Sequence, residues 1–257
     1  MNTPTAKPVC IVTGSSSGIG AATALLFAQQ GHDVVINYAS KAEPAERVAE
    51  QCRAAGAAAL VVQADVADDA QCRALADTVR QRWGRADVLV NNAGIATKFA
   101  DIKDLDAMSM HDFEATYRVN VVGAYQMARA LAPLLKAGPQ SAIVNISSLA
   151  GRQGTGSSIA YACSKGALNT LTLALARSLA PQVRVNAVLP GMVDSDWMRK
   201  GLGPEVFEQR RQRWESRALL NAMMSVQDVA RTAHWLATGA SKSTGQLIDL
   251  DAGFVLG

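Results

Sequence analysis

The chain has 257 residues, of which 49% are hydrophobic and 18% charged, so it can bury a core and is not a disordered chain. Its net charge of +3 is too small to indicate a nucleic-acid-binding surface. No apolar run reaches the ~18–20 residues that a membrane span needs, and the N-terminus does not resemble a secretory signal. The four cysteines have neither metal-ligand nor redox spacing. We therefore expect a cytoplasmic protein with reduced thiols and without a metal site.

Short β-branched runs alternate with helical patterns along the chain. Strands are expected at residues 9–13, 33–37, 58–63, 87–91, 142–146, 183–189 and 246–250. Helices are expected at about 18–30, 44–55, 68–83, 109–135, 159–179 and 225–238. Continuous apolar strands in strict alternation with helices indicate a parallel sheet that is covered on both faces. The sequence predicts one Rossmann-like α/β domain over residues 1–257, with a doubly wound, seven-stranded parallel sheet.

One long polar stretch, residues 195–220, interrupts this alternation and predicts a lid beside a site or a surface excursion. It holds six cations: Arg199, Lys200, Arg210, Arg211, Arg213 and Arg217. These fit either the solvated face of a lid helix or a contact to an acidic carrier or phosphorylated substrate. The apolar residues in and around the stretch fit an apolar substrate, or packing of the lid on its own domain. These residues are Met192, Trp197, Met198, Phe207 and Trp214.

A glycine-rich turn, T-G-S-S-S-G-I-G at residues 13–20, joins the first expected strand to the first helix. Glycine lets the backbone approach a ligand closely, and a helix start offers free N–H groups and a positive dipole end to an anion. This arrangement is typical of a dinucleotide pyrophosphate site. The spacing differs from the common G-x-G-x-x-G pattern, so an ordinary strand-to-helix loop is the alternative.

The second expected strand ends in Asn37, Tyr38, Ala39, Ser40 and Lys41, and no acid follows before position 43. An acid at such a strand end binds the ribose 2′-OH of NAD(H) and repels the 2′-phosphate of NADP(H). The absence of an acid favours NADP(H) over NAD(H). Lys41 on its own is compatible with a solvated residue at a helix start.

A phenol and an ammonium group, Tyr161 and Lys165, are four residues apart and share one face if this segment is helical. A phenol pKa is near ~10, and a neighbouring cation lowers a pKa by ~1–3 units. Ser148 lies 13 residues upstream, at the end of the fifth expected strand, where open α/β sheets bind ligands. Its hydroxyl and the phenol can converge on one carbonyl oxygen, although serine is also common in turns.

These motifs together resemble the short-chain dehydrogenase/reductase family, over residues 9–253. The resemblance also rests on N-N-A-G at residues 91–94, P-G at 190–191 and T-G-Q at 244–246. It implies a catalytic set of Asn120, Ser148, Tyr161 and Lys165. It implies cofactor contacts from Gly14, Ser15, Ser16, Ser17, Gly18, Ile19, Gly20, Asn37, Tyr38, Ser40, Asp65, Val66, Asn91, Ala93, Gly94, Tyr161, Lys165, Pro190, Gly191, Val193 and Ser195.

The resemblance also implies roles. Tyr161 would protonate the carbonyl oxygen and Ser148 would hydrogen-bond it. Lys165 would lower the pKa of Tyr161 and bind the nicotinamide ribose, and Asn120 would hold a water that links Lys165 to solvent. Ser17 stands where NADP-preferring members often carry Arg or Lys.

The resemblance favours a 3-oxoacyl-carrier-protein reductase-like enzyme. The alternatives are a reductase or dehydrogenase for a sugar, steroid or xenobiotic, and a non-catalytic NADP(H) sensor. We expect a small carbonyl or alcohol substrate, no nucleic-acid or membrane partner, and a homodimer or homotetramer.

Overall fold

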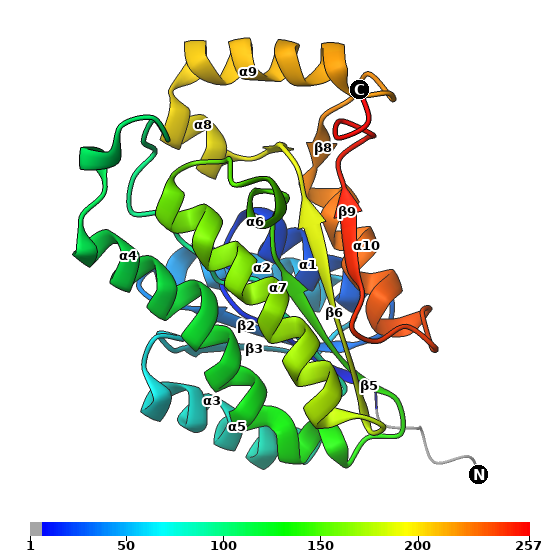
Figure 1. The fold of residues 1–257 in the computed structure, drawn as a ribbon. Coiled ribbons are helices and arrows are strands. Elements are labelled where there is room, and N and C mark those ends of the chain that lie inside the picture. Colours follow the sequence, from blue (N-terminus) through cyan, green and yellow to red (C-terminus); the bar gives the residue numbers. More distant parts are fainter. Residues whose placement is uncertain (1–6) are drawn as a thin grey trace.

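A seven-stranded parallel sheet forms the centre of the computed structural model, which describes residues 7–257 (Figure 1). The strand order is β3-β2-β1-β4-β5-β6-β9. The strands are β1 (Val9–Val12), β2 (Asp33–Tyr38), β3 (Ala59–Gln63), β4 (Val88–Asn91), β5 (Ser141–Ile146), β6 (Val183–Pro190) and β9 (Leu247–Leu250). Each expected strand is confirmed to within one residue at either end. Residues 1–6 lie outside the described range. The expectation that the N-terminus is not a secretory signal concerns these residues and stays a prediction.

Helices cover both faces of the sheet, as the continuous apolar strands predict. On one face lie α1 (Gly18–Gln29), α2 (Ala42–Ala54) and α10 (Val226–Thr238), and on the other lie α3 (Asp69–Trp83), α5 (Ala124–Lys136) and α7 (Ile159–Leu179). Successive strand residues point to opposite faces of the sheet. Val12 therefore packs in the core on the α1, α2 and α10 face, and Ile11 in the core on the α3, α5 and α7 face. The doubly wound α/β fold is confirmed.

The helix expected over residues 109–135 is not one regular α-helix. It consists of α4 (Met110–Tyr117), a π-helical turn (Arg118–Gly123) and α5, in direct succession. At the end of the π-helical turn, a Cβ on Gly123 would stand 2.7 Å from a Val66 methyl, so the backbone passes very close to the loop after β3. Periodicity in the sequence does not reveal such a turn, which in other proteins frequently marks a functional site.

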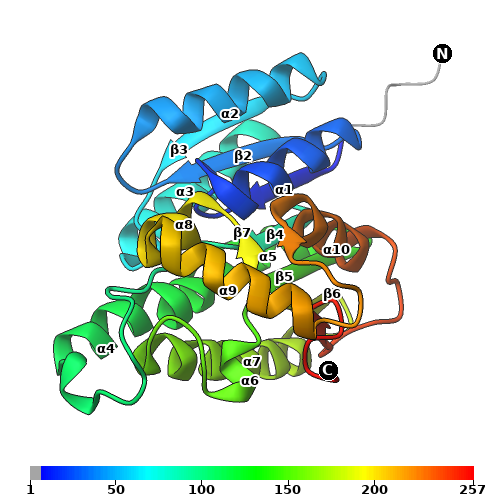
Figure 2. The ribbon, with the colours of Figure 1, turned by 90° about the horizontal axis from the view of Figure 1, so that it is seen from above.

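The polar stretch after β6 is mostly helical. β7 (Val193–Asp194) pairs with β8 (Met224–Ser225), and between them lie α8 (Asp196–Leu202) and α9 (Pro204–Arg217). These two helices lie across the carboxyl ends of the sheet strands (Figures 1 and 2). Two short helical segments, η1 (Leu105–Ala107) and α6 (Ala150–Gln153), were not expected. Within residues 7–257, no helix combines the length and apolar character needed to cross a membrane.

Candidate active site

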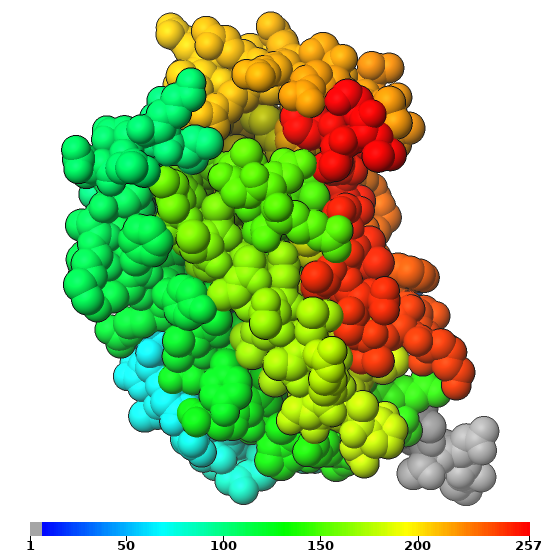
Figure 3. All heavy atoms as spheres, in the orientation of Figure 1, coloured from blue at the N-terminus to red at the C-terminus, as the bar shows by residue number. Residues whose placement is uncertain are grey.

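A cleft of about 1520 Å³ opens at the carboxyl ends of the strands, below α8 and α9. Figure 3 shows the yellow and orange atoms of these two helices standing above the green atoms of α6 and α7. Open α/β sheets bind ligands in this position. Most of the predicted site residues line the cleft: Gly14, Ser16, Ser17, Gly18, Ile19, Asn37, Tyr38, Ser40, Asp65, Val66, Ala93, Gly94, Ser148, Tyr161, Lys165, Pro190, Gly191, Val193 and Ser195.

The glycine-rich turn forms one end of the cleft floor. Gly14 and Gly18 have φ angles of +59° and +56°, a region that L side chains rarely adopt. A Cβ on Gly20 would stand 2.5 Å from the Asn92 amide nitrogen and 2.6 Å from the Gly14 carbonyl oxygen. Ser17, the N-cap of α1, makes no side-chain capping bond, so the first N–H groups of α1 remain available to an anion at the cleft. This cradle fits a dinucleotide pyrophosphate.

Three residues predicted to contact the cofactor, Ser15, Gly20 and Asn91, do not line the cleft and lie behind its wall. The Ser15 side chain is fully buried; its N–H donates to the Asn37 carbonyl (2.9 Å) and its hydroxyl to the Val12 carbonyl (2.8 Å). Gly20 is packed against the turn itself. The Asn91 amide donates to the Asn145 side-chain oxygen (2.9 Å) inside the sheet. Buried polar groups need such partners, and these residues shape the site without facing it.

The adenosine end of the cleft contains Tyr38, Ser40 and Lys41, directly after β2. The buried Asn37 amide joins this end to the glycine-rich turn, because its oxygen accepts from the Gly14 N–H (3.1 Å). The next acid in the chain, Glu43, is paired with Arg47 at 2.5 Å and does not line the cleft. This end of the cleft therefore offers the Lys41 cation and the Tyr38 and Ser40 hydroxyls. No carboxylate at the end of β2 lines it.

Ser148 and Tyr161 meet in the middle of the cleft. The Ser148 hydroxyl follows β5 and accepts from the Ala150 N–H (3.1 Å). Tyr161 lies in the first turn of α7, where the Ser158 N-cap hydroxyl accepts from the Tyr161 N–H (3.2 Å). The cap fixes where α7 begins and hence where the phenol stands.

Lys165 lies one helical turn further along α7, and its side chain is only 4% exposed. Its ammonium donates to the Ile146 carbonyl (2.8 Å) and lies 5.6 Å from the centroid of the Tyr161 ring. Burial lowers the pKa of Lys165 to about 8, because the charged form loses solvation.

The expected lowering of the Tyr161 pKa by Lys165 is wrong for this structure. Burial raises the pKa of Tyr161 to about 12, and a hydrogen bond with Ser148 offsets only part of that rise. The Tyr161 side chain borders the cleft, yet the protein packed around its hydroxyl makes desolvation the larger effect.

Asn120 lies in the π-helical turn, buried beside the cleft and not on its surface. Its amide nitrogen donates to the Ile95 carbonyl and to the Ser164 hydroxyl, both at 2.9 Å, and its oxygen accepts from the Ile95 N–H (2.8 Å). A Cβ on Gly94 would stand 3.3 Å from the Asn120 oxygen and 3.5 Å from the Lys165 ammonium. Asn120 and Lys165 therefore converge on Gly94.

Several cleft residues were missed or left without a role by the sequence analysis. Asn92 lines the cleft and donates to the Thr13 and Gly14 carbonyls, although only its neighbours in N-N-A-G were predicted as contacts. The rings of Phe99 and Trp197 pack at a tilt of 55° with centroids 4.9 Å apart, and the Trp197 and Tyr161 ring centroids are 5.9 Å apart. Phe99 lies in an irregular segment, where no periodicity could have singled it out.

Comparison with known proteins decides the family. The family model described as enoyl-(acyl carrier protein) reductase matches residues 14–255. A crystal structure from Burkholderia xenovorans, described as a short-chain dehydrogenase/reductase, has a TM-score of 0.91 and 45% identity, over 98% of this chain and 100% of that one. This chain belongs to the short-chain dehydrogenase/reductase family. It is an NAD(P)-dependent dehydrogenase or reductase.

The names of several relatives in the family specify an activity, and two of them are the following. Ketoacyl reductase 2 of the granaticin polyketide synthase of Streptomyces violaceoruber is 38% identical, over 96% of this chain and 95% of its own length. The 3-oxoacyl-[acyl-carrier-protein] reductase of Synechocystis sp. is 35% identical, over 96% of this chain and 97% of its own length. The predicted resemblance to this family, and to its 3-oxoacyl-carrier-protein reductase-like members, is confirmed.

Proposed function

We propose that this protein transfers a hydride between NADP(H) and a carbonyl or secondary-alcohol carbon, as a 3-oxoacyl thioester reductase. The observation that carries the proposal is the meeting of Ser148, Tyr161 and Lys165 at the end of β5, inside the cleft that the glycine-rich turn also lines. The names of the two ketoacyl-reducing relatives support the substrate class. The nicotinamide, when bound, supplies the hydride chemistry, and the residues below orient and protonate.

In this proposal Tyr161 is the proton donor to the carbonyl oxygen. A phenol with a pKa of about 12 stays protonated at neutral pH, which is the state that reduction requires. Ser148 donates a second hydrogen bond to the same oxygen as negative charge develops there. Lys165 binds the nicotinamide ribose and returns a proton to Tyr161, and Asn120 positions the water that connects Lys165 to solvent.

The preference for NADP(H) over NAD(H) rests on the adenosine end of the cleft. Tyr38, Ser40 and Lys41 offer hydroxyls and a cation to a 2′-phosphate, and no carboxylate of β2 repels it. We expect Tyr38→Asp to shift the ratio of Kd values toward NADH. Tighter binding of NADH than of NADPH by the wild-type protein would contradict this assignment.

The aromatic rings beside Tyr161 favour an apolar group next to the reacting carbonyl. The Trp197 and Phe99 rings pack against one another at this point of the cleft. An acyl chain or a steroid or xenobiotic ketone suits this surface better than a sugar, so a carbonyl reductase for apolar ketones is the second candidate.

The remaining proposals concern organisation. We propose one domain over residues 1–257 with residues 195–220 as the substrate lid, in the cytoplasm, where the four free cysteines remain reduced. We also propose a homodimer or homotetramer. Support comes from a stripe of exposed apolar side chains along α4, the π-helical turn and α5: Met110, Phe113, Tyr117, Val122 and Tyr125. Light scattering tests this assembly, which a monomer at micromolar concentration would contradict.

The test of the catalytic proposal is a panel of a 3-oxoacyl thioester, a steroid ketone and an aldohexose, with NADPH and NADH, followed at the nicotinamide absorbance. Tyr161→Phe should keep NADPH affinity and lose at least ~10²-fold in turnover, because the proton donor is gone. Tyr125→Phe, which removes an exposed hydroxyl on α5, is the matched control. A wild-type protein that binds NADPH but reduces nothing in the panel would favour the sensor instead.

A further inference from the structure

Four cations on α8 and α9 line the cleft: Lys200, Arg210, Arg213 and Arg217, here called the roof cations. The three arginines occupy positions i, i+3 and i+7 of α9, which place them on one helix face. That face spans roughly 10 Å along the helix axis.

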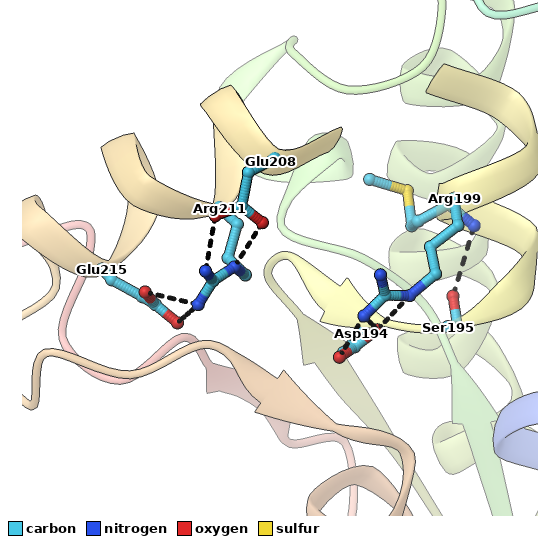
Figure 4. Close-up of polar contacts among 7 residues, drawn as sticks. Asp194, Ser195, Arg199, Glu208, Arg211 and Glu215 are labelled. Carbon is cyan, nitrogen blue, oxygen red and sulfur yellow. Dashed lines mark hydrogen bonds and ion pairs between the residues drawn. The ribbon is translucent and has the colours of Figure 1, made fainter. Parts of the chain in front are cut away.

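The other two arginines of the same segment are neutralised by carboxylates. Arg211 is bound by Glu208 at 2.5 Å and by Glu215 at 3.1 Å, one helical turn to either side (Figure 4). Arg199 is bound by both oxygens of Asp194, at 2.9 and 2.8 Å.

The roof cations have no such partners. None of them has an Asp or Glu carboxylate within ion-pair distance in the part of the chain that the structure describes. Arg217 donates to the main-chain oxygen of the last residue, Gly257 (3.3 Å), and lies 4.6 Å over the Phe254 ring, so its charge is partly offset at the C-terminus. Like charges at i, i+3 and i, i+4 repel one another, so this face is left with charge that an anion would offset.

The acids that line the cleft do not cancel this charge. Asp194 is already bound by Arg199, and Asp65 follows β3, at the adenosine side of the cleft. Asp196, in the first turn of α8, is the remaining acid of the cleft lining. Among the acidic side chains of the cleft lining, only Asp196 therefore stands against the four roof cations.

We propose that the roof cations recognise a phosphate group on the substrate, remote from the reacting carbonyl. This inference rests on the proposed reductase function. Guanidinium forks match the geometry of phosphate oxygens, and several of them suit a dianion better than a single carboxylate. The pantetheine arm of the substrate would lie along Trp197 and Phe99, between the phosphate and Tyr161. The class is an acyl thioester with a phosphate on its pantetheine arm, whether free or attached to a carrier.

The first experiment compares two thioesters with the same reacting group. Acetoacetyl-CoA carries phosphates, and the acetoacetyl thioester of N-acetylcysteamine carries none. In the double variant Arg210→Gln/Arg213→Gln, the ratio of kcat/KM for the first over the second should fall about tenfold or more, the equivalent of ~1.4 kcal/mol. Arg211→Gln, an arginine of the same helix that is paired with glutamates, should leave the ratio unchanged. An unchanged ratio in the double variant would overturn the proposal.

A binding measurement keeps this test separate from that of the reductase function. Phosphopantetheine should bind the NADPH-saturated wild-type protein in calorimetry, and at least tenfold more weakly to the double variant. If binding behaves so but neither thioester is reduced, the recognition stands and the reductase function fails. If the double variant loses NADPH affinity by the same factor, the roof cations serve the cofactor phosphates and the proposal is overturned. Acetoacetyl-carrier protein, assayed beside acetoacetyl-CoA, then shows whether the attached or the free arm is preferred.

Discussion

The floor and the roof of the cleft are built by different means. The floor is a network of buried hydrogen bonds between strands: the Thr13 hydroxyl accepts from the Asn92 and Ala93 N–H groups at 3.0 Å, and Asn37 bonds to Gly14. The roof is made of exposed helices held by surface ion pairs and by stacked rings such as Trp214 on Phe254, 3.8 Å apart.

This difference separates two tasks. A buried network leaves no freedom for side-chain change, which suits a cofactor common to a large family. Exposed helices on a rigid scaffold tolerate changes of charge and shape, which suits the choice of substrate. Substitutions in the floor should therefore change cofactor affinity and stability, and those in the roof should change substrate preference alone.

The largest expected effect is that of Gly20→Ala in the floor. The new methyl would overlap the Asn92 amide and the Gly14 carbonyl, so we expect a loss of roughly 1–3 kcal/mol in unfolding free energy. NADPH affinity should fall at least ~10-fold, because the turn must shift. Denaturant unfolding and fluorescence titration measure both. Gly84→Ala is the control, since Gly84 has a φ of +67° and open space around it, and it should cost stability without changing NADPH affinity.

The next largest effect is a pH dependence of kcat/KM, which arises from Lys165 beneath the roof helices. With a Lys165 pKa of about 8, the ammonium loses its proton as pH rises through that value. The kcat/KM for reduction should be level below about pH 8 and fall up to tenfold per unit above it, while Tyr161 remains protonated. Lys165→Arg should be slower but keep its charge, so its profile should show no bend near pH 8. A wild-type profile that stays flat to pH 10 would contradict the assignment to Lys165.

In the roof, Trp197→Ala should act on the substrate alone. Trp197 is 41% exposed and contacts Phe99 and Tyr161, so its loss removes apolar contact area from the carbonyl site. We expect KM for an apolar ketone to rise about tenfold, as ~1–2 kcal/mol of burial is lost, with NADPH affinity unchanged. Trp235→Ala, half-exposed on α10 and outside the cleft, should change neither value. A loss of NADPH affinity in Trp197→Ala would contradict the claim that substitutions in the roof change substrate preference alone.

The smallest effect concerns stability far from the cleft. His32 and His234 pack against Phe27, with ring centroids 5.0 and 4.9 Å from it, and burial lowers the pKa of both. As pH falls below ~6.5, these two histidines take up protons in the unfolded chain before they do so in the folded protein. The free energy of unfolding therefore decreases as pH falls through this range. We expect Tm to fall between pH 7.5 and 5.5, by roughly 2–4 °C for each kcal/mol of unfolding free energy that is lost. In His234→Gln, Tm should fall less over the same pH range. His111→Gln, at an exposed site, should behave like the wild type.

Much of the fold and the site was predictable from the sequence alone. Strand positions followed from continuous apolar runs, because a strand buried on both faces admits only such residues. The glycine-rich turn and the Tyr161–Lys165 pair each lie within one local segment, where spacing fixes the relative position, whereas Ser148 was identified from its place after the fifth strand and from the family resemblance. These features depend on local geometry, which the sequence encodes directly.

Other features depend on contacts between distant segments, and only the tertiary structure decided them. The π-helical turn directs Asn120 to Ile95, on a loop 25 residues earlier in the chain. The pKa of Tyr161 is set by the protein packed around it, which no spacing to Lys165 reveals. Arg211 pairs with Glu208 and Glu215 within α9 itself, but only the docking of the helix over the cleft determines that Arg210, Arg213 and Arg217 line it. Desolvation and charge pairing are properties of the packed chain, so they become defined only when the segments have come together.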